Sequence, residues 1–124
     1  MNFTSLGEVL SDDCREELYN QLIAKSERFF LKDRSSSIPV ACRFACSQSY
    51  DSFQREWFDE KLSYVVYMEN YGVMVLTEPY KFLKFLEERE PWEDYDVCIF
   101  DRGLTFCVAL THNDEIKFIN LVHA

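Results

Sequence analysis

Alternation of apolar and polar residues is clearest in the last third of the chain, where it predicts consecutive strands at 95–101, 104–111 and 115–121. Short connectors between them contain Gly, Asn and Asp, which tolerate the positive φ angles of tight hairpins. We therefore expect an antiparallel meander whose large-residue face packs against helices. The middle strand has Leu104, Phe106, Val108 and Leu110 on its large-residue face, and Thr105, Cys107, Ala109 and Thr111 on the other.

Helical periodicity predicts two helices before this meander. The first covers 12–25, because Ser11 is a good capping residue and the apolar positions that follow it recur on one face. That face contains Cys14, Leu18 and Leu22. The second begins at Pro79, which is tolerated in a first turn, and stops before Pro91.

Three further strands are predicted outside the meander. The segments 62–69 and 73–77 are rich in Val and Tyr, and the turn at 70–72 joins them as a hairpin. The small apolar residues at 38–46 predict a strand whose Pro39 implies an edge position.

Three other segments have less definite patterns of secondary structure. The segment 27–32 is compatible with a short strand, and 1–10 with one short turn. Aromatic residues recur at helical spacing between 49 and 60, which fits a helix and an irregular segment about equally well. These aromatic residues are Tyr50, Phe53 and Trp57.

Together these elements predict one α+β domain over residues 1–124. Its sheet is mostly antiparallel, with about five to seven strands and two or three helices packed mainly on one face. We expect the large-residue face of the 104–111 strand to pack against both helices. The helix residues expected there are Leu18, Leu22, Phe82, Leu83 and Leu86.

Composition and charge narrow the possible partners. Apolar residues form 48% of the chain, and its 11 Phe and 7 Tyr exclude a disordered protein. The 22 acidic and 13 basic residues give a net charge of −9, which repels nucleic acid and anionic lipid and attracts basic proteins. Solubility also favours net negative charge. No apolar run approaches the roughly 20 residues of a membrane span.

The cysteines predict a reducing environment. Their number, five, is odd and they are scattered, which does not suit a disulfide framework. The N-terminus also lacks the basic flank and apolar core of a signal peptide. We therefore expect a cytoplasmic protein with reduced thiols.

The sequence offers little catalytic chemistry. Cys107 and His112 form a possible thiol–base pair, although no motif fixes their geometry. Cys42 and Cys46 are four residues apart, and on a strand their side chains would lie about 13 Å apart, too far to share a metal ion. The chain also has no phosphate-binding Gly-rich loop, so we expect no enzyme activity, no cofactor and no metal site. A small enzyme using Cys107 and His112, or an acidic subunit of a larger complex, are the alternatives.

One acidic cluster stands out, between 87 and 96, because aromatic residues lie among its acids. Aromatic anchors surrounded by charge are typical of protein interfaces. Alternatively, Trp92 packs the helix end against the sheet and the acids are ordinary surface. The predicted partner-binding residues are Glu87, Glu88, Glu90, Trp92, Glu93 and Asp94. A second acidic set, the alternative interface, surrounds Trp57 and consists of Asp51, Glu56, Asp59 and Glu60.

Three stretches carry a family resemblance. They are Tyr80-Lys81-Phe82-Leu83-Lys84-Phe85-Leu86, Glu90-Pro91-Trp92-Glu93-Asp94-Tyr95-Asp96, and the meander with Ile99-Phe100-Asp101, Phe106 and Thr111-His112-Asn113-Asp114-Glu115. The region 57–121, about half of the chain, resembles small bacterial immunity proteins of contact-dependent growth inhibition systems. The resemblance implies a cytosolic α+β protein that binds and blocks the C-terminal toxin domain of a delivered effector. The sequence leaves the oligomeric state open, and we favour a monomer. Such toxins are often basic nucleases, which an acidic inhibitor would suit.

Overall fold

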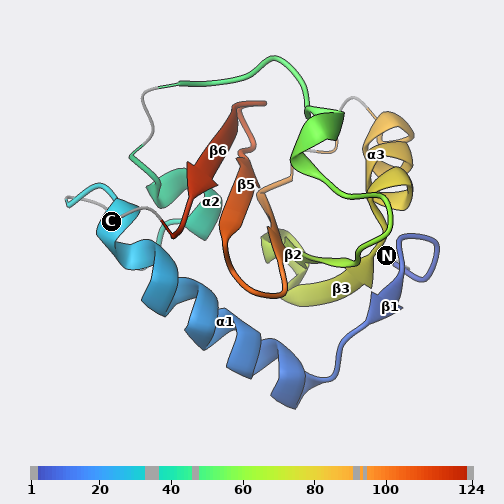
Figure 1. Cartoon of the computed structure of the whole chain (residues 1–124), viewed down its shortest axis with the longest axis horizontal. Helices are drawn as coiled ribbons and strands as arrows, with labels where there is room; N and C mark the ends of the chain where they lie inside the picture. The colour runs from blue at the N-terminus through green and yellow to red at the C-terminus, as the bar shows by residue number, and fades with distance from the viewer. Residues whose placement is uncertain (1–2, 33–36, 46–47, 91–92, 94, 123–124) are drawn as a thin grey trace.

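One antiparallel sheet forms the centre of the computed structural model, which describes residues 3–32, 37–45, 48–90, 93 and 95–122 (Figure 1). Within these residues the sheet has six strands in the order β1-β3-β2-β4-β5-β6. The predicted α+β domain with a mostly antiparallel sheet is therefore confirmed. The strands are β1 (Glu8–Val9), β2 (Tyr64–Met68), β3 (Val73–Thr77), β4 (Val97–Asp101), β5 (Phe106–Leu110) and β6 (Ile116–Asn120).

The described residues contain three α-helices, α1 (Asp12–Ser26), α2 (Val40–Arg43) and α3 (Pro79–Glu87). The cap predicted for α1 is present, because the Ser11 hydroxyl accepts a hydrogen bond from the Cys14 N–H at 3.3 Å. α3 begins with Pro79 in its first turn, as predicted. None of these helices is long and apolar enough to cross a membrane.

The helices cover both faces of the sheet. On one face Phe82 of α3 packs in a cluster with Val66, Ile99 and Val108. On the other face Leu22 of α1 joins a cluster that includes Val65 and Phe100. Two of the three helices, α1 and α2, share this second face, and α3 lies alone on the first.

The predicted contacts of β5 are therefore correct for α3 and wrong for α1. Phe106, Val108 and Leu110 lie on the α3 face, whereas Leu18 and Leu22 pack on the opposite face. That face carries the small residues of β5, Cys107 and Ala109, which leave room for α1 and α2 to approach the sheet. Leu104 also packs there, because its φ of 54° is left-handed and breaks the alternation before β5 begins.

The strand predicted at 38–46 is wrong, because its centre forms α2. The Glu69 carboxylate accepts hydrogen bonds from the backbone N–H groups of Val40 and Ala41, at 2.7 and 2.8 Å. These bonds satisfy donors that a helix N-terminus leaves free, and the negative charge suits the helix dipole. A carboxylate 29 and 28 positions away in sequence thus overrides the local strand preference.

Within the described residues, the segments 1–10, 27–32 and 49–60, whose structure the sequence left undecided, contain only short elements. At 27–32 the chain forms a 3₁₀ turn at Glu27–Phe29 and then a single bridge from Phe30 to Phe44, not a strand. The segment 49–60 is the irregular alternative, with a bridge from Tyr50 to Ile116 and a 3₁₀ turn at Arg55–Trp57. At the N-terminus the short edge strand β1 replaces part of the turn expected at 1–10.

We expect α3 to depend on its single buried phenylalanine. Phe82 is fully buried, so Phe82→Ala should lower the free energy of unfolding by about 3–5 kcal/mol. Tyr80→Ala on the same helix is the control; Tyr80 is 53% exposed, and its loss should cost less than about 0.5 kcal/mol. Urea denaturation measures the free energy of unfolding of both variants. If Phe82→Ala is already unfolded without urea, Phe82→Leu replaces it, with a smaller and measurable decrease in that free energy. A cost below about 1 kcal/mol for Phe82→Ala would contradict the packing of α3.

Candidate functional site

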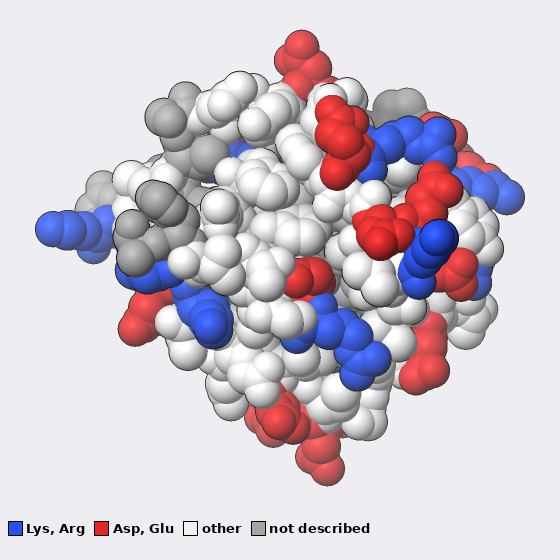
Figure 2. All heavy atoms as spheres, in the orientation of Figure 1, with Lys and Arg blue, Asp and Glu red and all other residues white. Residues whose placement is uncertain are grey.

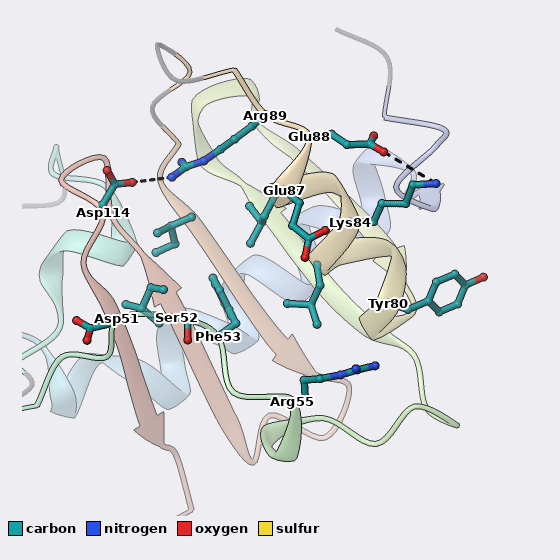
Figure 3. Close-up of a pocket in the computed structure, with 14 residues that line it drawn as sticks. Asp51, Ser52, Phe53, Arg55, Tyr80, Lys84, Glu87, Glu88, Arg89 and Asp114 are labelled. Carbon is teal, nitrogen blue, oxygen red and sulfur yellow. Dashed lines mark hydrogen bonds and ion pairs between the residues drawn. The ribbon is translucent and has the colours of Figure 1, made fainter.

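An open groove of about 910 Å³ lies between α3, the segment 51–55 and the ends of β5 and β6 (Figure 3). α3 forms one wall, and the irregular segment 51–55 forms another. Because these segments are far apart in sequence, the groove exists only in the folded chain. It is lined by Asp51, Ser52, Phe53, Arg55, Tyr80, Leu83, Lys84, Leu86, Glu87, Glu88, Arg89, Leu110, Asp114 and Ile116.

The groove has an apolar floor. Leu83 and Leu86 from α3 meet Leu110 and Ile116 from β5 and β6, and Phe53 stands beside them. Phe53 is held in place by an edge-on contact with Phe82, their ring centroids being 5.1 Å apart. An apolar floor of this kind supplies contact area for a ligand or a partner side chain.

Charged residues surround this floor, and Figure 2 shows acidic and basic side chains interleaved over the α3 side of the molecule. Each basic side chain of the rim forms an ion pair with an acidic one. Arg89 pairs with Asp114 at 2.7 Å, and Lys84 approaches Glu88 at 3.9 Å. Arg55 pairs with Glu60 at 2.8 Å.

Two acids of the rim, Asp51 and Glu87, have no ion pair with any described residue. In Figure 3 Glu87 points from α3 toward the side where Phe53 and Arg55 lie, whereas Glu88 lies beside Lys84. Both Asp51 and Glu87 are exposed. The groove therefore presents uncompensated negative charge next to an apolar floor.

The predicted interface residues have different positions in the structure. Glu87 and Glu88 line the groove. Glu93 does not line it and stabilises the local turn: it accepts hydrogen bonds from the Tyr95 hydroxyl at 2.5 Å and the Glu90 N–H at 3.0 Å. The Tyr95 bond, then the Glu90 bond, lowers the pKa of Glu93. Trp92 and Asp94 lie outside the described residues.

The described aromatic residues near the two acidic sets belong largely to the core. Tyr95 is buried and its ring stacks on Phe85, so it is not a surface anchor. Trp57 is half-buried and packs edge-on against Tyr50. Of the alternative acidic set, Asp51 lines the groove, whereas Glu56, Asp59 and Glu60 do not. In the folded chain, Asp51 of the second set therefore lines the same groove as Glu87 and Glu88 of the first.

A second polar constellation combines Cys42 of α2, Asp96 just before β4 and His112 just after β5. The Cys42 thiol donates to Asp96 Oδ1 at 3.4 Å, and its Sγ lies 3.8 Å from His112 Nδ1. His112 Nδ1 is 3.0 Å from Asp96 Oδ1, which also accepts the His112 backbone N–H at 3.0 Å. Asp96 is buried, Cys42 is partly buried and His112 is exposed.

This constellation is not arranged as a nucleophilic relay. In such a relay the base contacts the nucleophile through one ring nitrogen and its orienting acid through the other. Here Cys42 and Asp96 both lie next to the same Nδ1 atom of His112. Burial and then the hydrogen bond to Asp96 raise the pKa of Cys42 to about 12, so the thiol is protonated at neutral pH. Such a thiol is a poor nucleophile.

The Cys107–His112 pair considered from the sequence does not form, because the thiol that lies next to His112 is that of Cys42. Cys107 is fully buried on the face of the sheet that α1 and α2 cover, in one cluster with Cys98. Five positions of extended chain, about 16 Å, separate it from His112. Sequence analysis missed Cys42 because it placed that residue on a strand, and no local spacing links residues 42, 96 and 112.

The chain was compared with known protein families, with curated proteins and with solved structures, and no match was found. The groove and the Cys42–Asp96–His112 constellation are therefore the two candidate sites of this protein.

We expect the thiols to differ sharply in reactivity. The four described cysteines are free, and Cys14 is exposed whereas Cys98 and Cys107 are buried. In a Cys46→Ser background at pH 8 with a chelator present, a disulfide reagent should modify Cys14 first. Cys42 should react at least about 100-fold more slowly, because little of it is thiolate below a pKa of about 12. Mass spectrometry of the labelled peptides measures the order, and equal rates at Cys14 and Cys42 would contradict the raised pKa.

Proposed function

We propose that this chain is a cytoplasmic immunity protein that binds and neutralises a cognate, basic toxin domain without catalysis. The observation that carries the proposal is the groove, where the carboxylates of Asp51 and Glu87, which form no ion pair with any described residue, border an apolar floor. A basic segment of the toxin is the occupant that complements it: its cations would meet these acids while an apolar side chain enters between α3 and β5. The resemblance of 57–121 to immunity proteins motivates the choice of a toxin as partner.

The overall charge supports the same partner. A net charge of −9 attracts a basic domain over distances comparable to the Debye length and speeds its encounter. Rim charges contribute mainly to the association rate, whereas the buried contacts of the floor determine how slowly the complex dissociates. Inhibition needs this combination, since an immunity protein must capture a toxin quickly and retain it.

Inhibition by binding also fits the chemistry of the described side chains. The thiol of Cys42 has a raised pKa, and its neighbours do not form a relay. The groove itself is lined by charged and apolar side chains, and the described residues that line it include no Cys or His. Blocking a toxin requires only a complementary surface, and the acids and apolar floor of the groove support this role.

The first test of this function is protection of growing cells. We expect a large effector gene beside the gene of this chain, and the C-terminal domain of that effector, expressed with and without this chain, is the toxin probe. We expect the wild-type chain to restore growth and the double variant Asp51→Lys/Glu87→Lys to fail. The control Glu16→Lys/Glu17→Lys makes the same change in net charge on α1, which covers the opposite face of the sheet. If the wild-type chain does not protect, the proposed function is wrong.

Binding kinetics of the same proteins locate the interface. Asp51→Lys/Glu87→Lys should slow association with the toxin domain about 10-fold or more at low salt, because the local field that steers a basic partner is reversed. The effect should shrink as salt rises. Both acids are exposed and unpaired within the described residues, so the unfolding midpoint should change little.

The control variant is expected to associate at a rate close to that of the wild type. If the two double variants slow association equally, only net charge matters and the groove is not the interface. Protection of cells together with unchanged kinetics in Asp51→Lys/Glu87→Lys would place the toxin on another surface.

A further inference from the structure

Cys42, Asp96 and His112 bring three metal-ligating atoms to one point. A thiol sulfur, an imidazole nitrogen and a carboxylate oxygen all lie within 4.8 Å of one another. The residues come from three separate parts of the fold: α2, the residue before β4, and the turn between β5 and β6. Cys42 is 54 positions from Asp96 and 70 from His112.

The separations of these atoms match the edges of a zinc tetrahedron. Zn²⁺ lies about 2.3 Å from a thiolate and about 2.0–2.1 Å from imidazole nitrogen or carboxylate oxygen, so its tetrahedral ligands are roughly 3.4–3.6 Å apart. Here Cys42 Sγ is 3.4 Å from Asp96 Oδ1 and 3.8 Å from His112 Nδ1. His112 Nδ1 is 3.0 and 3.3 Å from the two Asp96 oxygens. Shifts of a few tenths of an ångström would seat the ion.

The chemistry of the three ligands selects the metal. Thiolate, imidazole and carboxylate together suit Zn²⁺, whereas Mg²⁺ and Ca²⁺ prefer oxygen ligands alone. A Cys42 thiolate and the Asp96 carboxylate would carry two negative charges, which balance one Zn²⁺ ion.

Neighbouring residues already hold the ligands in position. Glu69 binds the backbone N–H groups of Val40 and Ala41, which fixes the start of the short helix that carries Cys42. The Asn70 side chain accepts the Asp96 backbone N–H at 2.8 Å. The His112 N–H bonds to Asp96 Oδ1, which fixes the turn against the sheet. Supporting contacts of this kind orient ligands and strengthen metal sites.

We propose that Cys42, Asp96 and His112 bind one Zn²⁺ ion. The side chain of His112 is 49% exposed, so solvent reaches this place, and we assign the fourth position to a water molecule. The bound ion would fasten α2 and the β5–β6 turn to the start of β4. This inference is independent of the groove and of the proposed toxin partner.

The test uses Co²⁺ as a spectroscopic substitute for Zn²⁺, with the full chain purified without a histidine tag and under reducing conditions. The wild-type chain should bind one equivalent of Co²⁺ and show visible bands of tetrahedral geometry with a thiolate-to-cobalt charge-transfer band. Zn²⁺ should displace the cobalt, and Mg²⁺ should not. Absence of a saturable tetrahedral spectrum would overturn the proposal.

Variants then identify the ligands. Cys42→Ser should abolish the charge-transfer band, and Cys42→Ser and His112→Gln should each weaken Zn²⁺ binding by about 100-fold or more. Cys14→Ser and Cys46→Ser are the matched thiol controls and should bind like the wild type. Circular dichroism checks that each variant is folded. If Cys42→Ser is unfolded, His112→Gln provides the test instead, because His112 is exposed and its replacement should leave the fold intact. Wild-type affinity in a folded His112→Gln variant, or loss of the band in Cys46→Ser alone, would show that the metal binds elsewhere.

Discussion

The two central strands, β2 and β4, are apolar along both of their faces, and this constraint determines where the other elements pack. Val65 and Val66 are adjacent on β2 and point to opposite faces, yet both are fully buried. Ile99 and Phe100 repeat the pattern on β4. Burying each apolar side chain contributes about 1.5–3 kcal/mol, so neither face can be left in water. Helices are therefore required on both faces.

The different sizes of the covering helices account for the groove. α1 has 15 residues and shares its face with α2, whereas α3 has nine residues and lies alone. A nine-residue helix is only about 13 Å long, too short to cover its face of the sheet. The segment 51–55 covers part of the remainder, and the gap between it and α3 is the groove. The candidate binding surface thus follows from how the sheet is covered.

Two carboxylates connect the outer elements to this sheet. Glu69, just after β2, holds the start of α2, and Asp96, just before β4, contacts Cys42 and His112. Burial raises the pKa of Glu69, although its two backbone hydrogen bonds act in the opposite direction. A partly buried carboxylate is costly unless it is paired with donors, and here the donors come from α2. The same contacts that attach α2 also create the Cys42–Asp96–His112 constellation.

The sequence by itself determined the elements whose signals are local. The Ser11 cap, Pro79 in a first turn and the alternation of 106–110 depend on neighbours within a few residues, and α1, α3 and β5 form there. It also located Glu87 and Glu88, two acids of the groove, through their local density of charge.

Only the tertiary structure decided how these elements and side chains meet. Val40–Arg43 is helical because Glu69 caps it from a distant part of the chain, and nothing local to that segment indicates this bond. Likewise, Asp51 joins Glu87 across the groove, and Cys42 meets His112 across 70 positions. Such contacts depend on the packing of both sheet faces, because apolar burial brings together segments whose polar side chains carry no shared signal in the sequence.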